Sequence, residues 1–223
     1  MLIPSIDLMD AKIVQLVQGE RKAVESTDFD YWIDRFASFP LVQLIDLDAA
    51  MGKGSNRELI AAICGRLPCQ VGGGVRSIDR ARELLSGGAR RVIFGSSLLK
   101  DGGIDAAFAE ECGRELGAQL LTFAIDSRAG KVAIKGWRED TNIDPYAMIR
   151  ELQGSCGAFL YTHIDSEGTM AGFPTDIARR LRSATQRQMI VAGGIRSKEE
   201  VAALDAIGVD AVVGMAIYTG KMR

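Results

Sequence analysis

The sequence predicts a (β/α)8 barrel, and three observations lead to this fold class. The chain has 223 residues, a length at which one α/β barrel commonly forms a single domain. Short apolar segments alternate with amphipathic segments throughout, which is typical of a parallel α/β fold. The landmarks at the ends of these segments recur once, about 119 residues later. We therefore expect one domain over residues 1–223, with half-barrels at about 1–117 and 118–223.

Eight apolar segments are the expected barrel strands. They are rich in Val, Ile, Leu and Phe without strict alternation, as parallel strands buried on both faces should be. The strands are Leu2–Leu8, Leu41–Leu47, Cys69–Gly72, Arg91–Gly95, Leu120–Asp126, Ala158–Ile164, Gln188–Gly193 and Ala211–Met215. The helices expected between them are Asn56–Arg66, Ser77–Leu85, Ile104–Leu116, Ala147–Leu152, Asp176–Ala184 and Lys198–Ala206. Ser77 and Ser197 stand in capping positions.

The internal repeat supports the barrel most strongly. Asp7 and Asp126 each end an expected strand 119 residues apart, and Lys12 and Lys131 keep the same spacing. Four further landmarks recur at offsets of 119 or 120: Ile45-Asp46 as Ile164-Asp165, Asp48 as Glu167, Gly73–Ser77 as Gly193–Ser197, and Gly95 as Gly214. A duplicated half-barrel explains this spacing. Since barrel chemistry lies at the carboxyl ends of the strands, we expect a nearly two-fold site and a ligand with two similar ends.

The last expected strand is followed by only Ala216–Arg223. This leaves room for a short phosphate-binding helix but not for a full outer helix, so we expect the eighth helix to be short or missing. The barrel flank near the first and last strands is then either bare or covered by another subunit. The sequence therefore predicts a possible homo-oligomer.

Composition narrows the function classes. The net charge of −2, without a basic patch, makes nucleic acid an unexpected partner, and aromatic residues are sparse at 6%. Four cysteines form no CxxC pair, and a single His163 completes no metal site with them. We interpret Cys64, Cys69, Cys112 and Cys156 as buried thiols in a reducing compartment. No signal peptide or membrane span is recognised, so a cytoplasmic protein without a membrane partner is expected.

Two matched sets of glycine segments predict two phosphate sites. Gly72–Gly74 and Gly193-Gly194 each follow a strand and precede a helix, where backbone approaches an anion closely. Gly95–Ser97 and Gly214-Met215 end the following strands. One such pair alone is explained as a tight turn. Two sets at corresponding strand ends favour phosphate binding, and we expect Arg76 to assist.

Two carboxylates are the candidate catalytic groups. Asp7 and Asp126 are expected to face each other across the barrel mouth, where different surroundings let one act as base and the other as acid. The alternative is that each forms a structural ion pair, with Lys12 or Lys131. The symmetric placement favours catalysis.

The segment Thr162–Thr169 adds further candidates. Thr162 and Glu167 are expected to reach the mouth, while His163 points the opposite way and packs against the helices. Trp137 either stacks on a heteroaromatic ring or closes its loop as an apolar plug. Trp32, in the helix-like stretch Tyr31–Phe36, is interpreted as packing.

An ordered set of motifs over essentially the whole chain resembles the phosphoribosyl-formimino-aminoimidazole-carboxamide ribotide isomerases of histidine biosynthesis. The motifs are IPSIDL, LVQG at Leu16–Gly19, IDLDAA at Ile45–Ala50, QVGGGVRS at Gln70–Ser77, KVAIKGW at Lys131–Trp137, GT at Gly168-Thr169, AGGIRS at Ala192–Ser197 and VVGMAIYTGK at Val212–Lys221. The resemblance implies an Amadori rearrangement of an aminoaldose to a ketose without metal or organic cofactor.

The resemblance also implies residue roles. Asp7 matches the proton acceptor, Asp126 the proton donor, Thr162 an assisting threonine, and Trp137 a residue that packs on the carboxamide-imidazole. The expected binding residues are Gly72, Gly73, Gly74, Arg76, Gly95, Ser96, Ser97, Trp137, Gly172, Gly193, Gly194, Gly214 and Met215. Three positions depart from many members: Glu167 replaces Asp and is a rival donor, Gln15 replaces Arg, and Gln43 replaces His.

Three alternatives stay open at this point. The related cyclase shares the design but usually carries Cys before the strand-one Asp, where Ser5-Ile6-Asp7 stands here. A non-catalytic phosphosugar-binding barrel has no need of both Asp7 and Asp126. A bifunctional isomerase that also accepts phosphoribosyl-anthranilate uses the same rearrangement.

Overall fold

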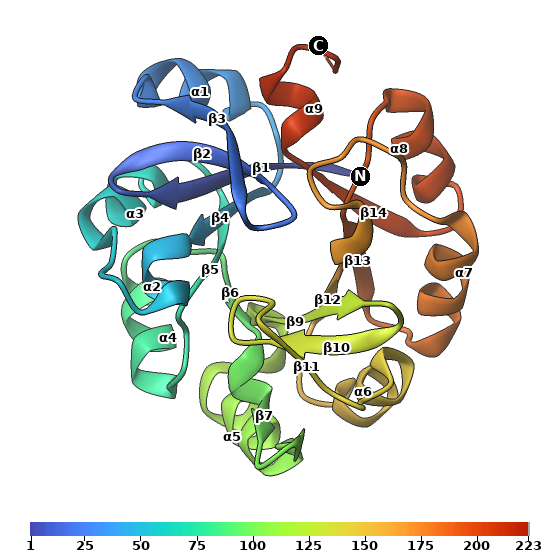
Figure 1. The fold of residues 1–223 in the computed structure, drawn as a ribbon. Helices are drawn as coiled ribbons and strands as arrows, with labels where there is room; N and C mark the ends of the chain where they lie inside the picture. The colour runs from blue at the N-terminus through green and yellow to red at the C-terminus, as the bar shows by residue number, and fades with distance from the viewer. Residues whose placement is uncertain (223) are drawn as a thin grey trace.

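The computed structural model describes residues 1–222 and contains a closed barrel of eight parallel strands (Figure 1). The strands pair in chain order, and pairings of β14 with β1 and of β6 with β9 close the ring. The predicted barrel is confirmed. Its strands are β1 (Leu2–Met9), β4 (Val42–Asp46), β5 (Cys69–Gly72), β6 (Arg91–Phe94), β9 (Leu121–Arg128), β12 (Ala158–His163), β13 (Gln188–Ala192) and β14 (Val209–Val213).

Helices surround the barrel on its outside (Figure 1). They are α1 (Phe29–Phe36), α3 (Arg57–Cys64), α4 (Ile78–Ser86), α5 (Ala106–Leu116), α6 (Pro145–Leu152), α7 (Thr175–Ala184) and α8 (Lys198–Asp205). The predicted caps are present, because the Ser77 side chain accepts from the Arg80 amide and that of Ser197 from the Glu200 amide. Within residues 1–222, no helix combines the length and apolar character that crossing a membrane requires.

The apolar core has two parts. A large cluster fills the space between strands and helices and includes the four cysteines, which are buried and unpaired. A smaller cluster fills the barrel interior with Ile3, Leu41, Ile93, Ala158, Leu160, Ile190, Ala192 and Val212. A buried amide contact, from Gln70 Nε2 to Gln43 Oε1 at 3.0 Å, lies among the strands. Apolar packing therefore fills the barrel and leaves its carboxyl end for a polar pocket.

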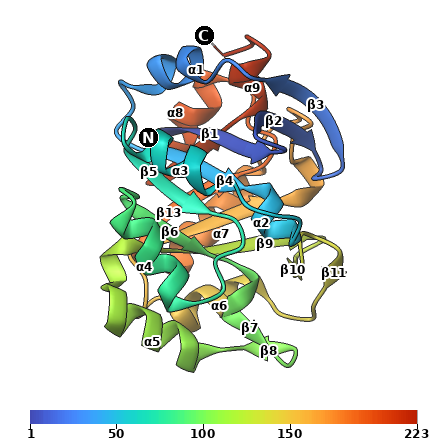
Figure 2. The same ribbon diagram turned by 90° about the vertical axis from the view of Figure 1, so that its left-hand side faces the viewer.

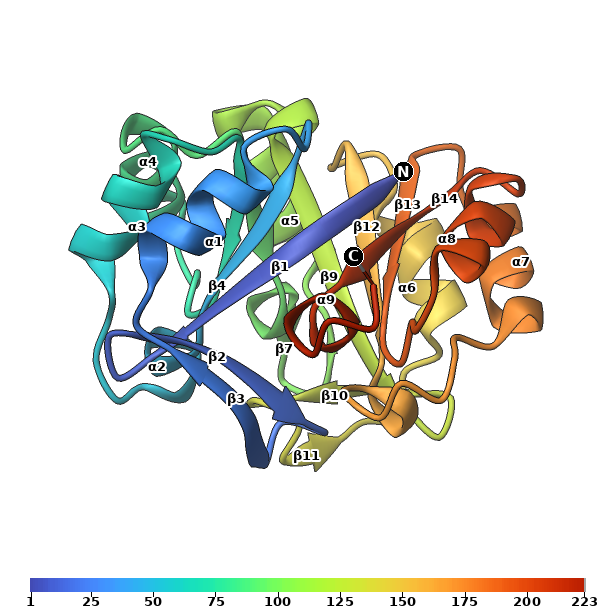
Figure 3. The ribbon, with the colours of Figure 1, turned by 90° about the horizontal axis from the view of Figure 1, so that it is seen from above.

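Two hairpins that the sequence did not predict extend from the barrel. In the first half, β1 continues into β2 (Lys12–Val17) and β3 (Arg21–Ser26); in the second, β9 continues into β10 (Lys131–Ile134) and β11 (Glu139–Asp140). Figures 2 and 3 show both hairpins at the same end of the barrel, near α2 (Leu47–Met51). They form walls around the mouth. A small third hairpin joins β7 (Leu99–Lys100) to β8 (Gly103–Ile104).

Between β14 and residue 222 the chain forms a single short helix, as predicted. This helix, α9 (Met215–Tyr218), has four residues. Trp32 of α1 packs on Tyr218 with ring centroids 4.1 Å apart and also contacts Phe36, so its interpretation as a packing residue is confirmed. An apolar groove remains beside α9, lined by Leu2, Tyr31, Trp32, Arg35, Phe36, Phe39, Lys198, Ile217, Tyr218, Gly220 and Met222.

Candidate active site

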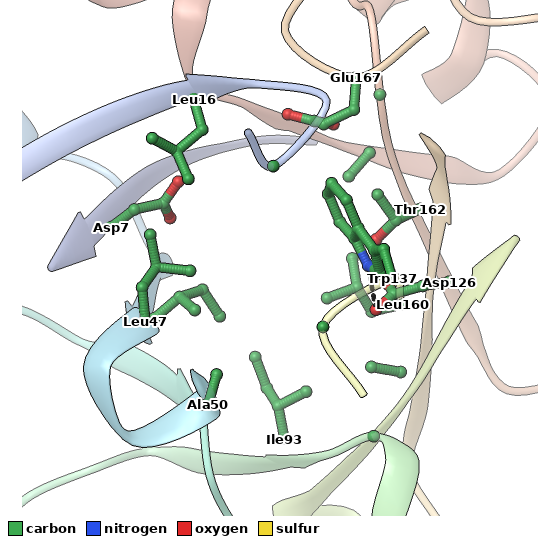
Figure 4. A pocket seen from close by; sticks show the side chains of 18 of the residues that line it. Asp7, Leu16, Leu47, Ala50, Ile93, Asp126, Trp137, Leu160, Thr162 and Glu167 are labelled. Carbon is green, nitrogen blue, oxygen red and sulfur yellow. Dashed lines mark hydrogen bonds between the residues drawn. The ribbon is translucent and has the colours of Figure 1, made fainter. Parts of the chain in front are cut away.

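A pocket opens at the carboxyl ends of the barrel strands, where the sequence places its polar landmarks. Figure 4 shows Asp7 on one wall, Asp126 and Thr162 on the opposite wall, and Glu167 on a third side. Apolar side chains such as Leu47, Ile93 and Leu160 line the rest. Three carboxyl groups therefore share one partly apolar pocket.

Asp7 projects from the tip of β1, where β1 pairs with β4 on one side and β2 on the other. Its Oδ1 accepts a hydrogen bond from Ser5 Oγ at 2.8 Å, and its Oδ2 lies 3.4 Å from Gln15 Nε2. Burial disfavours the charged form and raises the pKa of Asp7 to about 6, although the Ser5 hydrogen bond lowers it. Asp7 is thus mainly ionised at neutral pH, with a proton affinity above that of an ordinary aspartate.

Asp126 occupies the equivalent tip of β9 and lies beside Thr162 in the register with β12. Its Oδ2 accepts a hydrogen bond from Trp137 Nε1 at 2.8 Å. Burial raises the pKa of Asp126, while hydrogen bonds from Trp137 and Thr162 lower it. Two donors therefore favour the ionised form of this acid.

The alternative of structural ion pairs for the two aspartates finds no support in the observed contacts. Lys12 pairs with Glu25 on the hairpin, and Lys131 Nζ donates to the carbonyl of Asn142. Within residues 1–222, no ion pair joins a lysine or arginine to Asp7 or Asp126. The pocket carboxylates are thus not compensated by a cation.

Glu167 enters the pocket from the loop after β12, behind the short 3-10 turn Ile164–Ser166. Burial, followed by repulsion from Asp7 and Asp126, raises the pKa of Glu167 to about 8, against a small lowering by the Gly168 amide. Its counterpart in the first half, Asp48, is fixed by hydrogen bonds: its Oδ2 accepts one from the Asp10 amide and one from Asn56 Nδ2. With a pKa of about 8, Glu167 keeps its proton at neutral pH.

The two glycine segments line the pocket on opposite sides of its mouth. Gly73 and Gly193 have φ angles of +97° and +114°, and a Cβ atom on either would lie 2.2 Å or 2.4 Å from the carbonyl oxygen of Asp46 or His163. Only glycine permits both this conformation and this approach. Each segment is thereby fixed against the preceding loop, and its backbone faces the pocket.

Trp137 closes the pocket between the two hairpins. It lies at φ +69° in the β10–β11 loop, and its ring packs against Gly19 of the β2–β3 loop, where a Cβ atom would lie 2.8 Å from Trp137 Cε3. The Gln18 amide also donates to the carbonyl of Glu167 at 3.1 Å. Three loops thus meet over the carboxylates, with one indole ring facing the interior.

His163 lies outside the pocket, as predicted. Its Nδ1 is 2.8 Å from Ser166 Oγ, and its ring contacts the edge of Phe173. Among residues 1–222, no cluster of His, Cys, Asp and Glu has a geometry suited to a metal ion.

Comparison with known proteins places this geometry in a family. The family model described as "Histidine biosynthesis protein" matches residues 1–223. The chain belongs to the histidine biosynthesis protein family. A relative from Methanocaldococcus jannaschii, named 1-(5-phosphoribosyl)-5-((5-phosphoribosylamino)methylideneamino)imidazole-4-carboxamide isomerase, is 36% identical over 98% of this chain and 94% of its own length. A relative with the same name from Thermus thermophilus is 34% identical over 100% of this chain and 96% of its own length. Another, from Methanosphaera stadtmanae, is 34% identical over 98% of this chain and 94% of its own length.

The pocket is lined by most of the residues that the sequence analysis predicts to be catalytic or to bind substrate. They are Asp7, Gly73, Gly74, Arg76, Gly95, Ser96, Asp126, Trp137, Thr162, Glu167, Gly193, Gly194, Gly214 and Met215. Three others do not line it: Gly72 faces Ile93 and Ile45, Ser97 Oγ donates to the carbonyl of Val75, and the Gly172 amide donates to the carbonyl of Gly194.

Sequence reasoning assigned no role to Ser5 and treated Gln15 only as a departure from the family pattern. Both are buried and both contact Asp7. The signal for Ser5 was present, because residues two apart on a strand share one face. No such signal existed for Gln15, because its contact with Asp7 depends on the β2 hairpin, which the sequence did not predict.

Proposed function

We propose that this chain catalyses the reaction for which its relatives are named, the isomerisation of the phosphoribosyl aminoaldose of the formimino-aminoimidazole-carboxamide ribotide to its ribulosyl ketose. One observation carries the proposal. Three carboxyl groups with raised pKa values lie between two matched glycine segments in one pocket. An Amadori rearrangement needs one acid and one base beside a sugar, and a bis-phosphate substrate needs two anion sites.

The first step is ring opening. A carboxylic acid protonates the ribose ring oxygen, the C1–O bond breaks, and the nitrogen lone pair forms a cationic imine at C1. Sequence reasoning assigned this proton to Asp126. The pKa of about 8 supports Glu167 as the donor, because an acid must hold a proton at neutral pH in order to give it. Asp126, which accepts a hydrogen bond from Trp137, is then assigned to the opposite wall of the pocket (Figure 4), where it faces the imine without donating the proton.

The second step is proton removal from C2. Beside the cationic imine this proton is acidic, and ionised Asp7 takes it, which yields an enolamine. Protonation of the enolamine at C1 and loss of the hydroxyl proton at C2 then give the ketose. The pKa of about 6 suits Asp7 for this role, because a base must be ionised yet retain affinity for a proton.

The two phosphates are assigned to the two glycine segments with their following loops. One is held over Gly73-Gly74 with Gly95-Ser96, assisted by Arg76, and the other over Gly193-Gly194 with Gly214-Met215. Both sets expose backbone to the pocket at symmetric strand ends. Trp137 lies between them and presents an aromatic face to the heterocycle.

The decisive experiment measures turnover of the aminoaldose by the purified protein before and after chelator treatment. Full activity after chelation supports a reaction carried by protein groups alone, whereas loss restored by one divalent ion contradicts it. Phosphoribosyl-anthranilate serves as the second substrate, because it undergoes the same rearrangement and tests the bifunctional alternative.

We propose further that a second copy of the chain covers the apolar groove beside α9. The groove and the exposed ring of Tyr31 support this, since contiguous apolar surface favours burial. The absence of nucleic-acid and membrane partners and a cytoplasmic location stay predictions that rest on composition.

A further inference from the structure

The two halves of the barrel present equivalent acids in unlike surroundings. Asp7 and Asp126 are related by the 119-residue repeat, and so are the starts of β2 and β10 at Lys12 and Lys131. At the same offset, Ser5 corresponds to Ala124 and Gln15 to Ile134. The carboxylate is thus repeated, whereas the two side chains that contact Asp7 are replaced by apolar ones in the second half. Repetition of the fold alone does not explain this difference.

Ser5 and Gln15 approach Asp7 from two directions. Ser5 lies two residues earlier on β1, and its hydroxyl donates to Oδ1 at 2.8 Å. Gln15 lies on the neighbouring antiparallel strand β2, with its amide nitrogen 3.4 Å from Oδ2. Both side chains are buried, at 5% and 4% exposure, and both line the pocket. Each carboxylate oxygen of Asp7 therefore faces its own donor.

Gly214, which has no side chain, leaves the space beside β2 that the Gln15 amide occupies. A Cβ atom on Gly214 would lie 2.0 Å from Gln15 Oε1, so the amide occupies the space that a side chain there would need. A side chain at this position would have to displace the Gln15 amide from its place beside Asp7. At the equivalent Gly95, the nearest contact of such a Cβ atom is 3.9 Å away. The space beside Gly214 is thus specific to the half that carries Asp7.

We infer that Ser5 and Gln15 are positioning residues that hold the Asp7 carboxylate from two sides, in the orientation in which it acts as the base of the reaction. This inference rests on the proposed function. Neither residue has to touch the substrate. They fix the plane of the carboxylate, and they stabilise its charge in a pocket where no cation does so.

In the part of the chain that the structure describes, the other charged and titratable groups around the pocket form no ion pair with Asp7. Of the two cations that line the pocket, Arg76 donates to the carbonyl of Ala50 and Lys135 pairs with Glu139. Glu167 faces Asp7 from the loop after β12, and the charge of Asp7 helps to raise the pKa of Glu167. Tyr218 of α9 is affected by the same charge, which raises the pKa of its phenol. Asp126 lies across the pocket, and Lys12 on β2 is engaged with Glu25. Loss of a donor should therefore leave Asp7 more readily protonated, without a neighbour to compensate.

The test is the pH profile of kcat/KM for Ser5→Ala and Gln15→Met. We expect Ser5→Ala to move the acid limb upward by about one pH unit, since a hydrogen bond to a charged group has about that effect. The alkaline limb, which reports the donor, should stay in place, and KM should change little. Gln15→Met should move the same limb by less, because its contact is longer. Ser5→Thr, which keeps a hydroxyl, should restore the wild-type limb.

Ala124→Ser is the matched control, because it adds a hydroxyl at the equivalent position of the other half; it should leave the acid limb unmoved.

NMR titration of 13C-labelled aspartate carboxyls gives a second readout without substrate. The Asp7 signal, assigned with Asp7→Asn, should titrate higher in Ser5→Ala than in the wild type. An unchanged Asp7 titration, or a fall in kcat with both limbs in place, overturns the inference. If the wild type turns over no aminoaldose, the proposed function fails, and the NMR comparison still decides whether Ser5 and Gln15 hold Asp7.

Discussion

Replacing Glu167 with Gln should make the protein more stable, by an amount that depends on pH. The pKa of Glu167 is raised from 4.5 to about 8, so the unfolded chain ionises this carboxyl several pH units before the folded protein does. Below pH 4.5 the group is protonated in both states and the pKa difference costs nothing. Between pH 4.5 and 8 the carboxyl ionises in the unfolded state but not in the folded state, so the free energy of unfolding falls as the pH rises. Above pH 8 the carboxyl is ionised in both states, and the loss of stability stays constant.

The size of this effect follows from the pKa difference. At about 1.4 kcal/mol per pH unit, the full difference corresponds to roughly 5 kcal/mol. The same pKa difference sets both the plateau and the pH at which it is reached, so we expect a gain of up to roughly 5 kcal/mol above pH 8. Gln keeps the shape and removes the titration. The free energy of unfolding of Glu167→Gln should therefore exceed that of the wild type by an amount that grows from pH 4.5 to pH 8 and then levels off.

Urea unfolding followed by tryptophan fluorescence at several pH values between 4 and 9 measures this difference. Glu110→Gln, an exposed glutamate on α5, is the control and should show no such dependence. A Glu167→Gln difference that is constant across the pH range would refute the reasoning. It would mean that Glu167 titrates alike in the folded and unfolded chain and is ionised at neutral pH, which excludes it as the donor.

Four further predictions concern activity and assembly. Asp7→Asn should lower kcat by about 10²- to 10⁴-fold, because the base is lost while shape is kept; single-turnover kinetics check this. Glu167→Gln should abolish turnover and Asp126→Asn should leave more of it, with phosphate binding intact in both; the reverse order assigns the proton to Asp126. The kcat/KM profile should be bell-shaped, rising near pH 6 as Asp7 ionises and falling near pH 8 as Glu167 ionises. The mass in solution should exceed the 24.0 kDa of one chain, and a strict monomer would contradict the proposed contact at the α9 groove.

The sequence predicted the parts of the fold that repeat and the parts that are apolar. Strand and helix bounds agree to within a few residues, since burial on both faces and capping leave clear patterns, as at Cys69–Gly72. The β2–β3 and β10–β11 hairpins were not predicted, because β3 and β11 are short and polar and resemble loops, and because β2 and β10 follow a barrel strand after only a short turn. Their omission hid Gln15. The boundary between half-barrels near residue 117 stays a prediction.

The site was predicted as a set of positions rather than as a set of protonation states. Strand-end placement identified Asp7, Asp126 and Glu167, but their relative acidity depends on what surrounds each carboxyl in space. Burial, followed by repulsion from Asp7 and Asp126, raises the pKa of Glu167, whereas burial raises the pKa of Asp126 against hydrogen bonds from Trp137 and Thr162 that lower it. These contacts join residues far apart in the chain, so sequence spacing does not reveal them.

The contrast between Asp48 and Glu167 has a consequence for how a duplicated barrel divides its work. In one half, Asp48 accepts hydrogen bonds from Asn56 and the Asp10 amide and fixes the loop. In the other half, the equivalent Glu167 is an acid whose pKa burial and repulsion raise to about 8. Neutralising the two should have effects of opposite sign. Asp48→Asn should lower stability, because two donors would then share a neutral acceptor. Glu167→Gln should raise it and cost activity. After duplication, one copy is thus free to diverge toward catalysis while the other keeps the loop in place.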